Sequence, residues 1–311
     1  MKKIDIFHKN IADFQNALII KIWQNTLRAH IATYMVFIFE NIFANVSKPH
    51  IFLQNGKQKE TFIVDIQKSI EKRVEWIKNL LSSTGAKGII YGNSGGKDCT
   101  LVGALCKLAT DNVLGVIMPC QSSQNYGSDR DDALKAGKHF GIEQIEVDLT
   151  ATKQALIDAL GDNLTRDKAS DYNLKMAGVN INPRLRMLTL YALGQARGYL
   201  VAGTGNLDEI TLGYFTKWGD GAHDFNPIAD LTVDEVFEHL RALNAPSSII
   251  DKAPSAGLYP GQTDEDELGI KYADVDRYLR GEQVSEDVVA RIEKAKRASA
   301  HKLRMPLKFE Q

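Results

Sequence analysis

Residues 88–99 read GIIYGNSGGKDC, an apolar run that leads directly into a glycine-rich turn. The apolar run predicts a short buried strand, and the leucines that follow, Leu101, Leu105 and Leu108, predict the inner face of a helix. Glycines at such a strand-to-helix turn let the backbone approach an anion closely, and the helix adds unpaired N–H groups and a positive dipole end. The stretch therefore predicts a cradle for phosphate.

The same alternation of strand and helix repeats after this cradle. Further strands are expected over residues 113–119, 142–149 and 199–206, and helices over 129–139, 151–160 and 183–197. Strands and helices that alternate at this spacing form right-handed crossovers and a parallel sheet covered on both faces. We therefore expect an α/β fold with a doubly wound parallel sheet. Ligands should bind beyond the carboxyl ends of its strands, after Gly92 and after Ala202.

The first 60 residues differ from the rest of the chain. They hold one glycine, Gly56, of the 24 in the sequence, and no turn chemistry interrupts residues 11–43, which favours helix. From Ile66 to Leu81, apolar residues recur at steps of three and four, which predicts one buried stripe on a helix. We expect a helical extension of unknown role over residues 1–60 and a functional domain over residues 61–311.

Composition and charge exclude several classes of protein. The 311 residues are 44% hydrophobic and 25% charged, and the net charge of -1 lacks the basic excess of a nucleic-acid binder. No run reaches the ~18 apolar residues of a membrane span, and the first residues lack the apolar core of a signal peptide. Cys99, Cys106 and Cys120 form no paired motif, which is typical of reduced thiols. We expect a cytoplasmic protein with no nucleic-acid or membrane partner.

The glycine-rich turn is not a P-loop of the Walker type. Gly92 lies five residues before Lys97, not the roughly six of that motif, and Asp98 stands where the motif has Ser or Thr. A carboxylate beside phosphates is repulsive unless a cation such as Mg²⁺ lies between them. An acid in the first turn of a helix is also mildly stabilising by itself. Asp98 therefore has both a metal-binding and a purely structural interpretation.

The run SGGKDC at residues 94–99 resembles the SGG-x-D-S signature of the ATP pyrophosphatase superfamily, whose members cleave ATP between the α and β phosphates. Cys99 departs from the signature, which ends in serine. A thiol is a weaker hydrogen-bond partner than a hydroxyl, and a small thiol in the first turn of a helix is generally a packing residue. We therefore do not expect Cys99 to act as a nucleophile.

Further runs narrow the resemblance to one family. They are GTGNLDE at residues 203–209, GYFTKWGDGAHD at 213–224, KAPSA at 252–256 and QTDEDELG at 262–269. Together and in this order they resemble the ammonia-dependent NAD synthetases, over about residues 62–311. The resemblance implies an adenine nucleotide alpha hydrolase-like fold and a homodimer whose dinucleotide sites lie at the interface.

The reaction that the resemblance implies has two steps and uses ATP and Mg²⁺. The nicotinate carboxylate of deamido-NAD attacks the α-phosphorus of ATP, which releases pyrophosphate and leaves an acyl adenylate, and ammonia then displaces AMP to give NAD. Metal binding is implied for Asp98 and Glu209. Contacts to ATP are implied for Gly92, Asn93, Ser94, Gly95, Gly96, Lys97, Asp98, Cys99, Thr204 and Ser255, and contacts to deamido-NAD for Arg184, Lys217, Asp224, His301 and Lys302.

Two further positions depart from the family pattern. Ser255 stands where the family has an ATP-contacting threonine, so a hydroxyl is kept, whereas Val233 stands where many members have an ATP-binding lysine. Some relatives carry a glutaminase domain with a cysteine nucleophile, but the 60 residues before the domain contain no cysteine. We expect free ammonia as the nitrogen source, the alternative being delivery by a separate amidotransferase.

Each assignment has a structural alternative. Lys217 has the sequence context of a solvated residue, and so do Arg184 and Arg186. Glu209 has that of a helix first turn, and the basic C-terminal segment that of a solvated helix end. Two other functions compete with the synthetase. A tRNA thiolase of the same superfamily would need a cysteine pair and a basic face, and a nucleotide sensor without catalysis would need no pair of metal-binding carboxylates.

Overall fold

The computed structural model describes residues 66–120, 127–165, 170–251, 265 and 268–309. The expected helical extension over residues 1–60 and the expected ATP contact Ser255 lie outside the described residues. Among the described residues, no helix combines the length and the apolar character that crossing a membrane requires.

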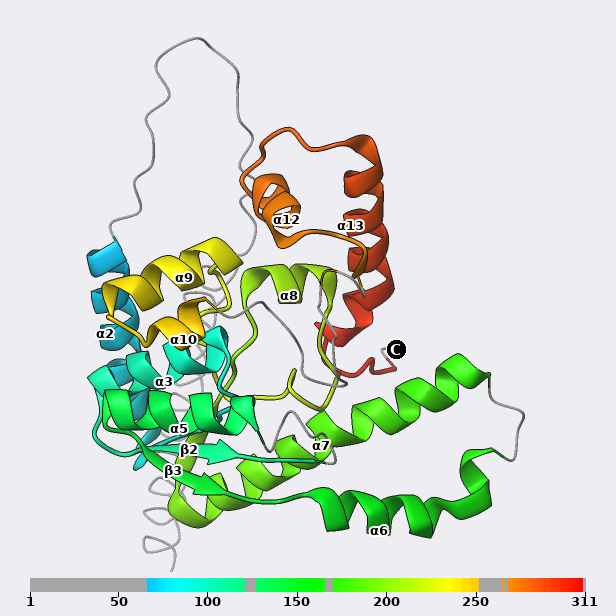
Figure 1. Ribbon diagram of the computed structural model, residues 1–311, viewed down its shortest axis with the longest axis horizontal. Helices are drawn as coiled ribbons and strands as arrows, with labels where there is room; N and C mark the ends of the chain where they lie inside the picture. Colours follow the sequence, from blue (N-terminus) through cyan, green and yellow to red (C-terminus); the bar gives the residue numbers. More distant parts are fainter. Residues whose placement is uncertain (1–65, 121–126, 166–169, 252–264, 266–267, 310–311) are drawn as a thin grey trace, which may run out of the picture. The chain divides into compact units, whose positions relative to one another are not determined.

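Parallel strands form the sheet at the centre of the described chain (Figure 1). Its order is β3-β2-β1-β4, so the chain first moves outward from β1 and then crosses to the opposite side of β1 to add β4. Neighbouring connections diverge at β1 and β4, and this switch point is where an open α/β sheet leaves a crevice for a ligand. The strands are β1 Gly88–Gly92, β2 Val113–Ile117, β3 Glu143–Glu146 and β4 Tyr199–Ala202.

The expected doubly wound parallel sheet is confirmed, with strands that end earlier than the sequence predicts. Tyr91 of β1 pairs with Ala202 of β4, so the turns that follow these two strands start side by side. The segment after β4 was expected to extend the strand to residue 206, but it leaves the sheet at Gly203, where the backbone N–H donates to the carbonyl of Phe225 at 2.8 Å.

Helices cover both faces of the sheet, and side chains of β1 alternate between them. Ile89 and Tyr91 are buried in the core that α2, α3 and α9 form with the sheet, whereas Ile90 is buried on the opposite face against α7. The helices are α2 Ile66–Thr84, α3 Lys97–Ala109, α5 Ser128–Phe140, α6 Thr150–Leu160, α7 Asp171–Arg197, α8 Leu207–Leu212, α9 Val233–Ala242, α10 Ser247–Ile250, α12 Tyr272–Leu279 and α13 Glu286–Ser299, with 3-10 turns at Gly161–Leu164 and Ala300–Lys302.

The apolar stripe predicted for the first of these helices is confirmed. Ile70 and Ile77 of α2 are buried, and Ile66, Val74 and Leu81 pack against the same core. In α3 the prediction is correct for Leu101 and Leu105, which are fully buried, but wrong for Leu108, which is 51% exposed. Leu108 lies one residue before the end of the helix, on its exposed side, whereas the adjacent Ala109 still packs against the core.

The helix predicted from residue 183 is longer than expected. It begins at Asp171 with a hydrogen bond from Asn173 N–H to the side chain of Ser170, and Pro183 lies inside it. A proline lacks the N–H that would close the helical bond to the carbonyl four residues earlier, which is why the sequence suggested a helix start there. Packing of the C-terminal half of α7 against β1 and β4 outweighs this local cost.

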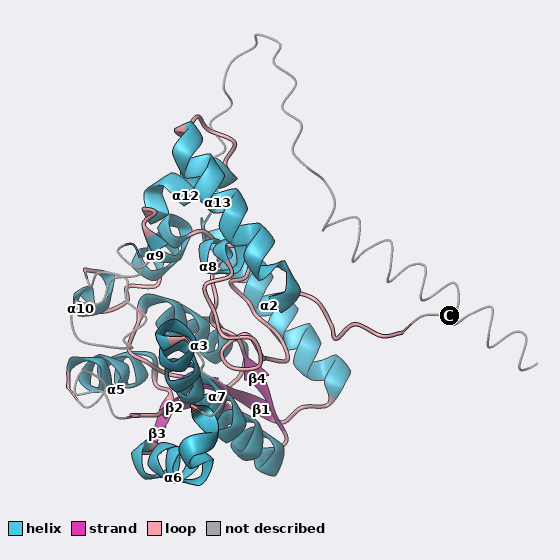
Figure 2. Ribbon diagram, turned by 90° about the vertical axis from the view of Figure 1, so that its right-hand side faces the viewer, coloured by secondary structure: helices cyan, strands magenta, loops and turns pink. Residues whose placement is uncertain are grey.

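The C-terminal helices form a small cluster of their own beside α8. Leu212 of α8, Val275 of α12 and Ile292 of α13 are buried together with Ile270. Both ribbon views place α12 next to α13 (Figures 1 and 2). This cluster brings the chain end back to α8, which directly follows the turn at the end of β4.

Candidate active site

The turn after β1 forms the phosphate cradle that the sequence predicts. Asn93 is 2% exposed, its amide Nδ2 donates to the carbonyl of Ala133 at 3.1 Å and to Gln144 Oε1 at 2.9 Å, and its Oδ1 accepts from Gly95 N–H at 3.1 Å. The side chain of Asn93 therefore fixes the turn to α5 and β3. Helix α3 follows with no side-chain cap at its N-terminus. Such an uncapped helix end directs N–H groups and a positive dipole toward an anion.

Gly95 is a position that requires glycine. Its φ is +75°, a left-handed conformation that other residues rarely adopt, and a Cβ built there would lie 2.2 Å from the carbonyl oxygen of Asp129. The turn can therefore pass against α5 only without a side chain at this position, and this close approach shapes the cradle.

The turn after β4 leads into α8 through a capping box. Asn206 is fully buried, and its Oδ1 accepts from Glu209 N–H at 3.0 Å, while Glu209 Oε2 accepts from Asn206 N–H at 3.1 Å. Glu209 thus has the structural role that its sequence position allowed. The same contacts also hold its carboxylate beside the cradle.

Asn206 joins the two acids expected to bind metal. Its Nδ2 donates to Asp98 Oδ1 at 3.1 Å, while its backbone N–H donates to Glu209. Lys97 Nζ lies 2.8 Å from Asp98 Oδ2, so this carboxylate is oriented from both sides. Within the described part of the chain, no group of three or more His, Cys, Asp or Glu is placed to hold a metal ion. Two carboxylates that face a phosphate site are nevertheless a donor set that suits Mg²⁺, which takes its remaining ligands from phosphate and water.

Cys99 is buried in the cradle. Its thiol is 3.2 Å from the carbonyl of Gly96 and 3.4 Å from Ser94 Oγ, and burial raises the pKa of this thiol above its usual value. A thiol with a raised pKa is a poor nucleophile at neutral pH, because the thiolate is the reactive form. The packing role that the sequence suggested for Cys99 is consistent with this environment.

One cavity of about 960 Å³ connects the two turns. Its lining includes the cradle after β1, the turn after β4, the middle of α7, the segment from Gly213 to His223 and the chain end at 301–305. Of the residues expected to bind substrates, the ones that line it are Gly92, Asn93, Ser94, Gly96, Lys97, Asp98, Cys99, Thr204, Glu209, Arg184, Lys217, His301 and Lys302. Residues 110 or more positions apart in sequence therefore share one site, as the sheet order requires.

The segment at residues 213–221 is tied to the chain end by two lysines. Lys217 Nζ donates to the carbonyl of His301 at 2.6 Å, and Lys302 Nζ donates to the carbonyls of Gly213 at 2.8 Å and Phe215 at 2.7 Å. Burial lowers the pKa of Lys302. Next to Lys217, Trp218 has a positive φ of 61°, so this segment holds a conformation that is unusual for a bulky residue.

Asp224 differs from the other expected dinucleotide contacts because it does not line the cavity of the single chain. Its Oδ2 accepts from Val201 N–H at 2.8 Å and its Oδ1 accepts from Tyr191 Oη at 3.2 Å. In the described structure this carboxylate therefore joins the edge of β4 to α7.

Two residues of the cavity were missed by sequence reasoning. Arg186 donates to the carbonyl of Met118 at 3.1 Å and lies deeper than Arg184, and the surrounding protein lowers the pKa of its guanidinium. Asp220 accepts from Thr216 N–H at 2.9 Å, and removal of water by the surrounding protein raises the pKa of its carboxyl. The sequence signal for Asp220 was its place between two glycines in GDG, whereas nothing in the sequence separated Arg186 from Arg184.

Val233, the position where a lysine was expected, lies in the core. It is 4% exposed, and its backbone N–H donates to Asp208 Oδ2 at 2.9 Å. It does not line the large cavity. The side chain at this position therefore makes no contribution to the cavity surface in the described structure.

A parallel sheet with a switch point, an uncapped helix end after β1 and the likeness to solved structures define an α/β enzyme with the adenine nucleotide alpha hydrolase-like fold. A family model described as NAD synthase matches residues 69–306, and the chain belongs to this family. It is an ammonia-dependent carbon–nitrogen ligase of NAD biosynthesis, since two curated relatives that are 43% and 41% identical over 78% of this chain are NH(3)-dependent NAD(+) synthetases.

Curated relatives and solved structures agree with this assignment. The NH(3)-dependent NAD(+) synthetase of Carboxydothermus hydrogenoformans is 43% identical over 244 residues, which is 78% of this chain and 97% of the relative. The NMN synthetase of Francisella tularensis superposes with a TM-score of 0.73 at 33% identity, over 79% of this chain and 99% of that one. The NH3-dependent NAD synthetase of Campylobacter jejuni gives a TM-score of 0.63 at 28% identity, over 79% and 100%.

Proposed function

We propose that the enzyme converts deamido-NAD to NAD with ATP, Mg²⁺ and free ammonia, through an acyl adenylate. The observation that carries this proposal is the single cavity in which the cradle after β1, the turn after β4 and the acids Asp98 and Glu209 meet. A nucleotide sensor without catalysis would need the cradle but not the two acids beside it.

In this proposal ATP occupies the cradle and the turn after β4. The backbone of Ser94 and Gly96 and the N-terminus of α3 face the phosphates, and Lys97 adds a positive charge. Gly95, which packs against α5 and does not line the cavity, is a contact proposed from the family resemblance alone. Thr204 lies across the crevice, at the start of the second turn. ATP contacts proposed from the family resemblance also include Gly92, Asn93, Cys99 and Ser255.

Asp98 and Glu209 would hold Mg²⁺. When bound there, Mg²⁺ would neutralise negative charge on the departing pyrophosphate. Asn206 keeps the two carboxylates on one side of the cavity, and Lys97 orients Asp98. Because these side chains are held before substrate binds, little reorganisation is needed during the reaction.

A carboxylate is a poor acyl electrophile, and this explains the two steps. Attack of the nicotinate oxygen on the α-phosphorus forms the acyl–phosphate bond and breaks the bond to pyrophosphate, after which ammonia forms the amide and AMP leaves. The cavity contributes to the reaction by holding the two anionic substrates next to each other in the orientation that the attack requires. Lys217, His301 and Lys302 from the loop and the chain end, with Arg184 from α7, are the proposed contacts of the dinucleotide.

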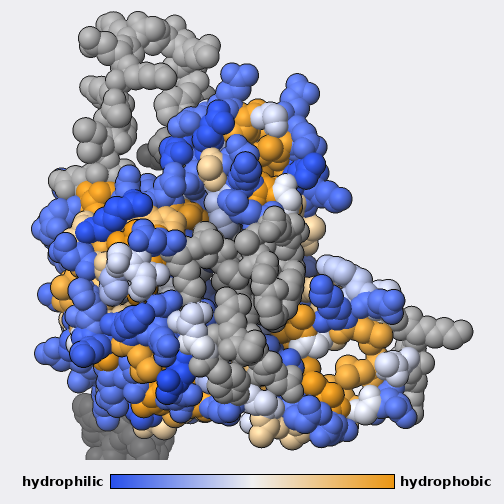
Figure 3. Space-filling view, in the orientation of Figure 1, coloured by the Kyte–Doolittle hydropathy of each residue, from blue (hydrophilic) through white to orange (hydrophobic). Residues whose placement is uncertain are grey.

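A homodimer is part of this proposal, since apolar side chains come to the surface around α6 and α7. None of the side chains of α6 is buried, and Tyr172 and Leu188 of α7 are 70% and 62% exposed. Figure 3 shows apolar side chains at the surface over these two helices, at the lower right of the view. A second copy of the chain would cover this surface and add to the dinucleotide site, where Asp224 is the contact that the single chain leaves outside the cavity.

The mononucleotide is the alternative acceptor, because one solved relative is named an NMN synthetase. The decisive experiment supplies purified enzyme with ATP, Mg²⁺ and ammonium and either deamido-NAD or nicotinate mononucleotide, and follows products by liquid chromatography. We expect NAD and AMP in equal amounts, with a higher kcat/KM for the dinucleotide. Glutamine in place of ammonium should give no product. Failure to convert deamido-NAD would refute the proposal. A higher kcat/KM for nicotinate mononucleotide would show that the mononucleotide, and not the dinucleotide, is the substrate that is amidated.

A further inference from the structure

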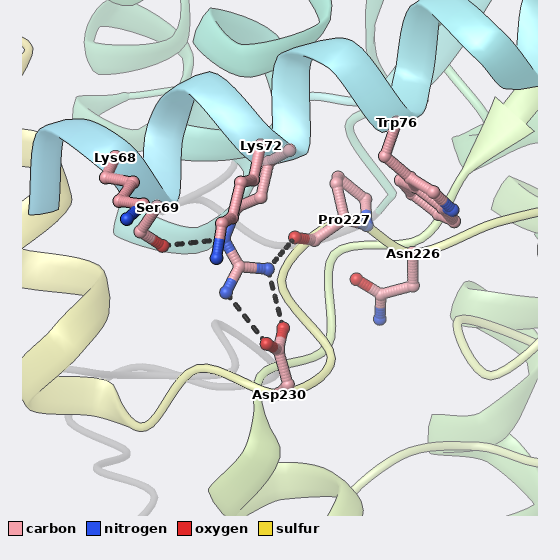
Figure 4. Close-up of a pocket in the computed structure, with 8 residues that line it drawn as sticks. Lys68, Ser69, Lys72, Trp76, Asn226, Pro227 and Asp230 are labelled. Atoms are coloured by element: carbon pink, nitrogen blue, oxygen red, sulfur yellow. Dashed lines mark hydrogen bonds and ion pairs between the residues drawn. The ribbon is translucent and has the colours of Figure 1, made fainter. Parts of the chain in front are cut away.

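A second, smaller cavity of about 540 Å³ lies where α2 meets the loop at residues 226–230, which precedes α9. Figure 4 shows the side chains of α2 on one side and those of the loop at residues 226–230 on the other. Asn226 lines this cavity and also the large one, so the loop separates α2 from the proposed ATP site. Contacts between α2 and this loop therefore fix the position of a residue, Asn226, that also lines the larger cavity.

Arg73 of α2 is the residue that holds this loop. Its Nη1 donates to the carbonyl of Pro227 at 2.6 Å and to Asp230 Oδ1 at 2.6 Å, and its Nη2 donates to Asp230 Oδ2 at 2.8 Å. The planar guanidinium thus grips a carboxylate with two bonds and a backbone carbonyl with a third. The Arg73 side chain is 15% exposed and that of Asp230 is 71% exposed, so this ion pair joins a largely buried side chain to one at the surface.

The loop in turn holds the turn after β4. Asn226 Oδ1 accepts from Ile228 N–H at 3.0 Å, which orients the side chain, and Asn226 Nδ2 donates to the carbonyl of Gly205 at 2.8 Å. Leu207 N–H donates to the carbonyl of Leu231 at 2.8 Å just beyond. The loop that Arg73 binds therefore holds both the turn that carries Thr204 and the start of α8, which carries Glu209.

Arg73 is itself oriented by a directional chain of hydrogen bonds. His239 Nδ1 lies 2.7 Å from the carbonyl of Glu235, which can only accept, so Nδ1 carries the proton and Nε2 accepts from Ser69 Oγ at 2.9 Å. Ser69 Oγ accepts from Arg73 Nε at 3.3 Å. His239 is fully buried, so this chain connects Arg73 to a rigid part of the core.

We propose that Arg73 is a positioning residue of the ATP site, which sets the place of the turn at residues 203–209 through Pro227, Asp230 and Asn226. This inference rests on the proposed function, which assigns that turn to ATP. Arg73 touches neither substrate, and it acts by fixing where Thr204 and the carboxylate of Glu209 stand relative to the cradle. A shift of the turn weakens ATP binding while the rest of the cavity, on α7 and the chain end, is unchanged.

The test compares Arg73→Gln with Lys72→Gln in the full-length enzyme. Lys72 is the neighbouring residue and lines the same small cavity. Lys72→Gln therefore removes the same positive charge as Arg73→Gln, but it breaks no bond to the loop. For Arg73→Gln we expect KM for ATP to rise about tenfold, the effect of losing about 1.4 kcal/mol of positioning. KM for deamido-NAD should stay within about twofold, because its contacts lie elsewhere. Arg73→Lys should recover part of the loss, since one ammonium can bond either Pro227 or Asp230.

The outcomes separate positioning from general support of the fold. An Arg73→Gln enzyme with unchanged KM for ATP, or with both KM values raised equally alongside a lowered Tm, overturns the inference. If Arg73→Gln does not fold, Asp230→Asn takes its place, because it keeps the bond from Arg73 to Pro227 and should raise KM for ATP by a smaller factor. If the parent enzyme makes no NAD, the proposed function fails, and ATP affinity measured by calorimetry on the same variants still decides the role of Arg73.

Discussion

Lys217 and Lys302 both line the cavity, and each donates to a backbone carbonyl of the segment that contains the other. Lys217 donates to the carbonyl of His301, next to Lys302, and Lys302 donates to the carbonyls of Gly213 and Phe215, on the segment that contains Lys217. Two segments that are 84 residues apart at the Lys217–His301 contact are thus joined by reciprocal charge-assisted hydrogen bonds.

Replacing Lys302 should loosen this arrangement. In Lys302→Ala two carbonyls lose a charged donor, and each such bond contributes roughly 1.5–3 kcal/mol. We expect KM for deamido-NAD to rise at least about tenfold, which corresponds to about 1.4 kcal/mol of that loss. Hydrogen exchange should speed up across residues 213–221 in the same variant. Lys308→Ala, at an exposed lysine of the same chain end, is the matched control. An unchanged KM together with unchanged exchange would show that the loop is held by other contacts.

The metal-binding role of Glu209 can be separated from its capping role. Glu209→Gln keeps an oxygen that accepts from Asn206 N–H, so the capping box and the fold should survive, but it removes the charge that would bind Mg²⁺. We expect turnover to fall at least about a hundredfold, with Tm within a few degrees of the parent, and the same pattern for Asp98→Asn. Steady-state rates and thermal melts provide the comparison, and Glu238→Gln, at an exposed position of α9, is the control. Near-normal turnover in both variants would remove the metal role.

A buried acid on α12 should make stability depend on pH. Burial, followed by the nearby charge of Asp208, raises the pKa of Asp276 to about 8. The unfolded carboxyl has a pKa of about 3.9, so the folded state holds a proton that the unfolded state releases. The stability that this difference contributes is fully present below about pH 4 and is lost as the pH rises through about 8.

Asp276→Asn should remove this dependence, because the amide cannot ionise. We expect the free energy of unfolding of the parent to fall more steeply than that of the variant between about pH 6 and about pH 8, measured by urea unfolding. Asp274→Asn, on the same helix but not fully buried, should keep the slope of the parent. Parallel slopes for parent and Asp276→Asn would show that this carboxyl is already ionised at neutral pH.

Removal of residues 1–60 should leave catalysis in place. The family model begins at residue 69, and every substrate contact proposed above lies after that residue. We expect the truncated enzyme to keep kcat/KM for ATP and deamido-NAD within about twofold of the full chain. A truncated protein that folds, by circular dichroism, but does not turn over would assign a catalytic role to the extension, and one that does not fold would assign it a structural role.

Local chemistry let the sequence alone determine much of this protein. The order of strands and helices, the cradle at residues 92–99 and the buried stripe of α2 each depend on neighbours within a few residues, so they are written in periodicity and turn residues. The family resemblance added the pairing of Asp98 with Glu209, and the structure brings these acids together through Asn206.

Tertiary structure alone decided the direction and partners of individual side chains. Arg186 rather than Arg184 lies deep in the cavity, Asp224 bonds to β4 instead of lining the site, and α7 continues through Pro183. The bonds from Arg73 to the loop span 154 and 157 residues of sequence. Such contacts arise from how distant segments pack, and no pattern of neighbouring residues encodes them, because a side chain's environment is set by the elements that the fold brings against it.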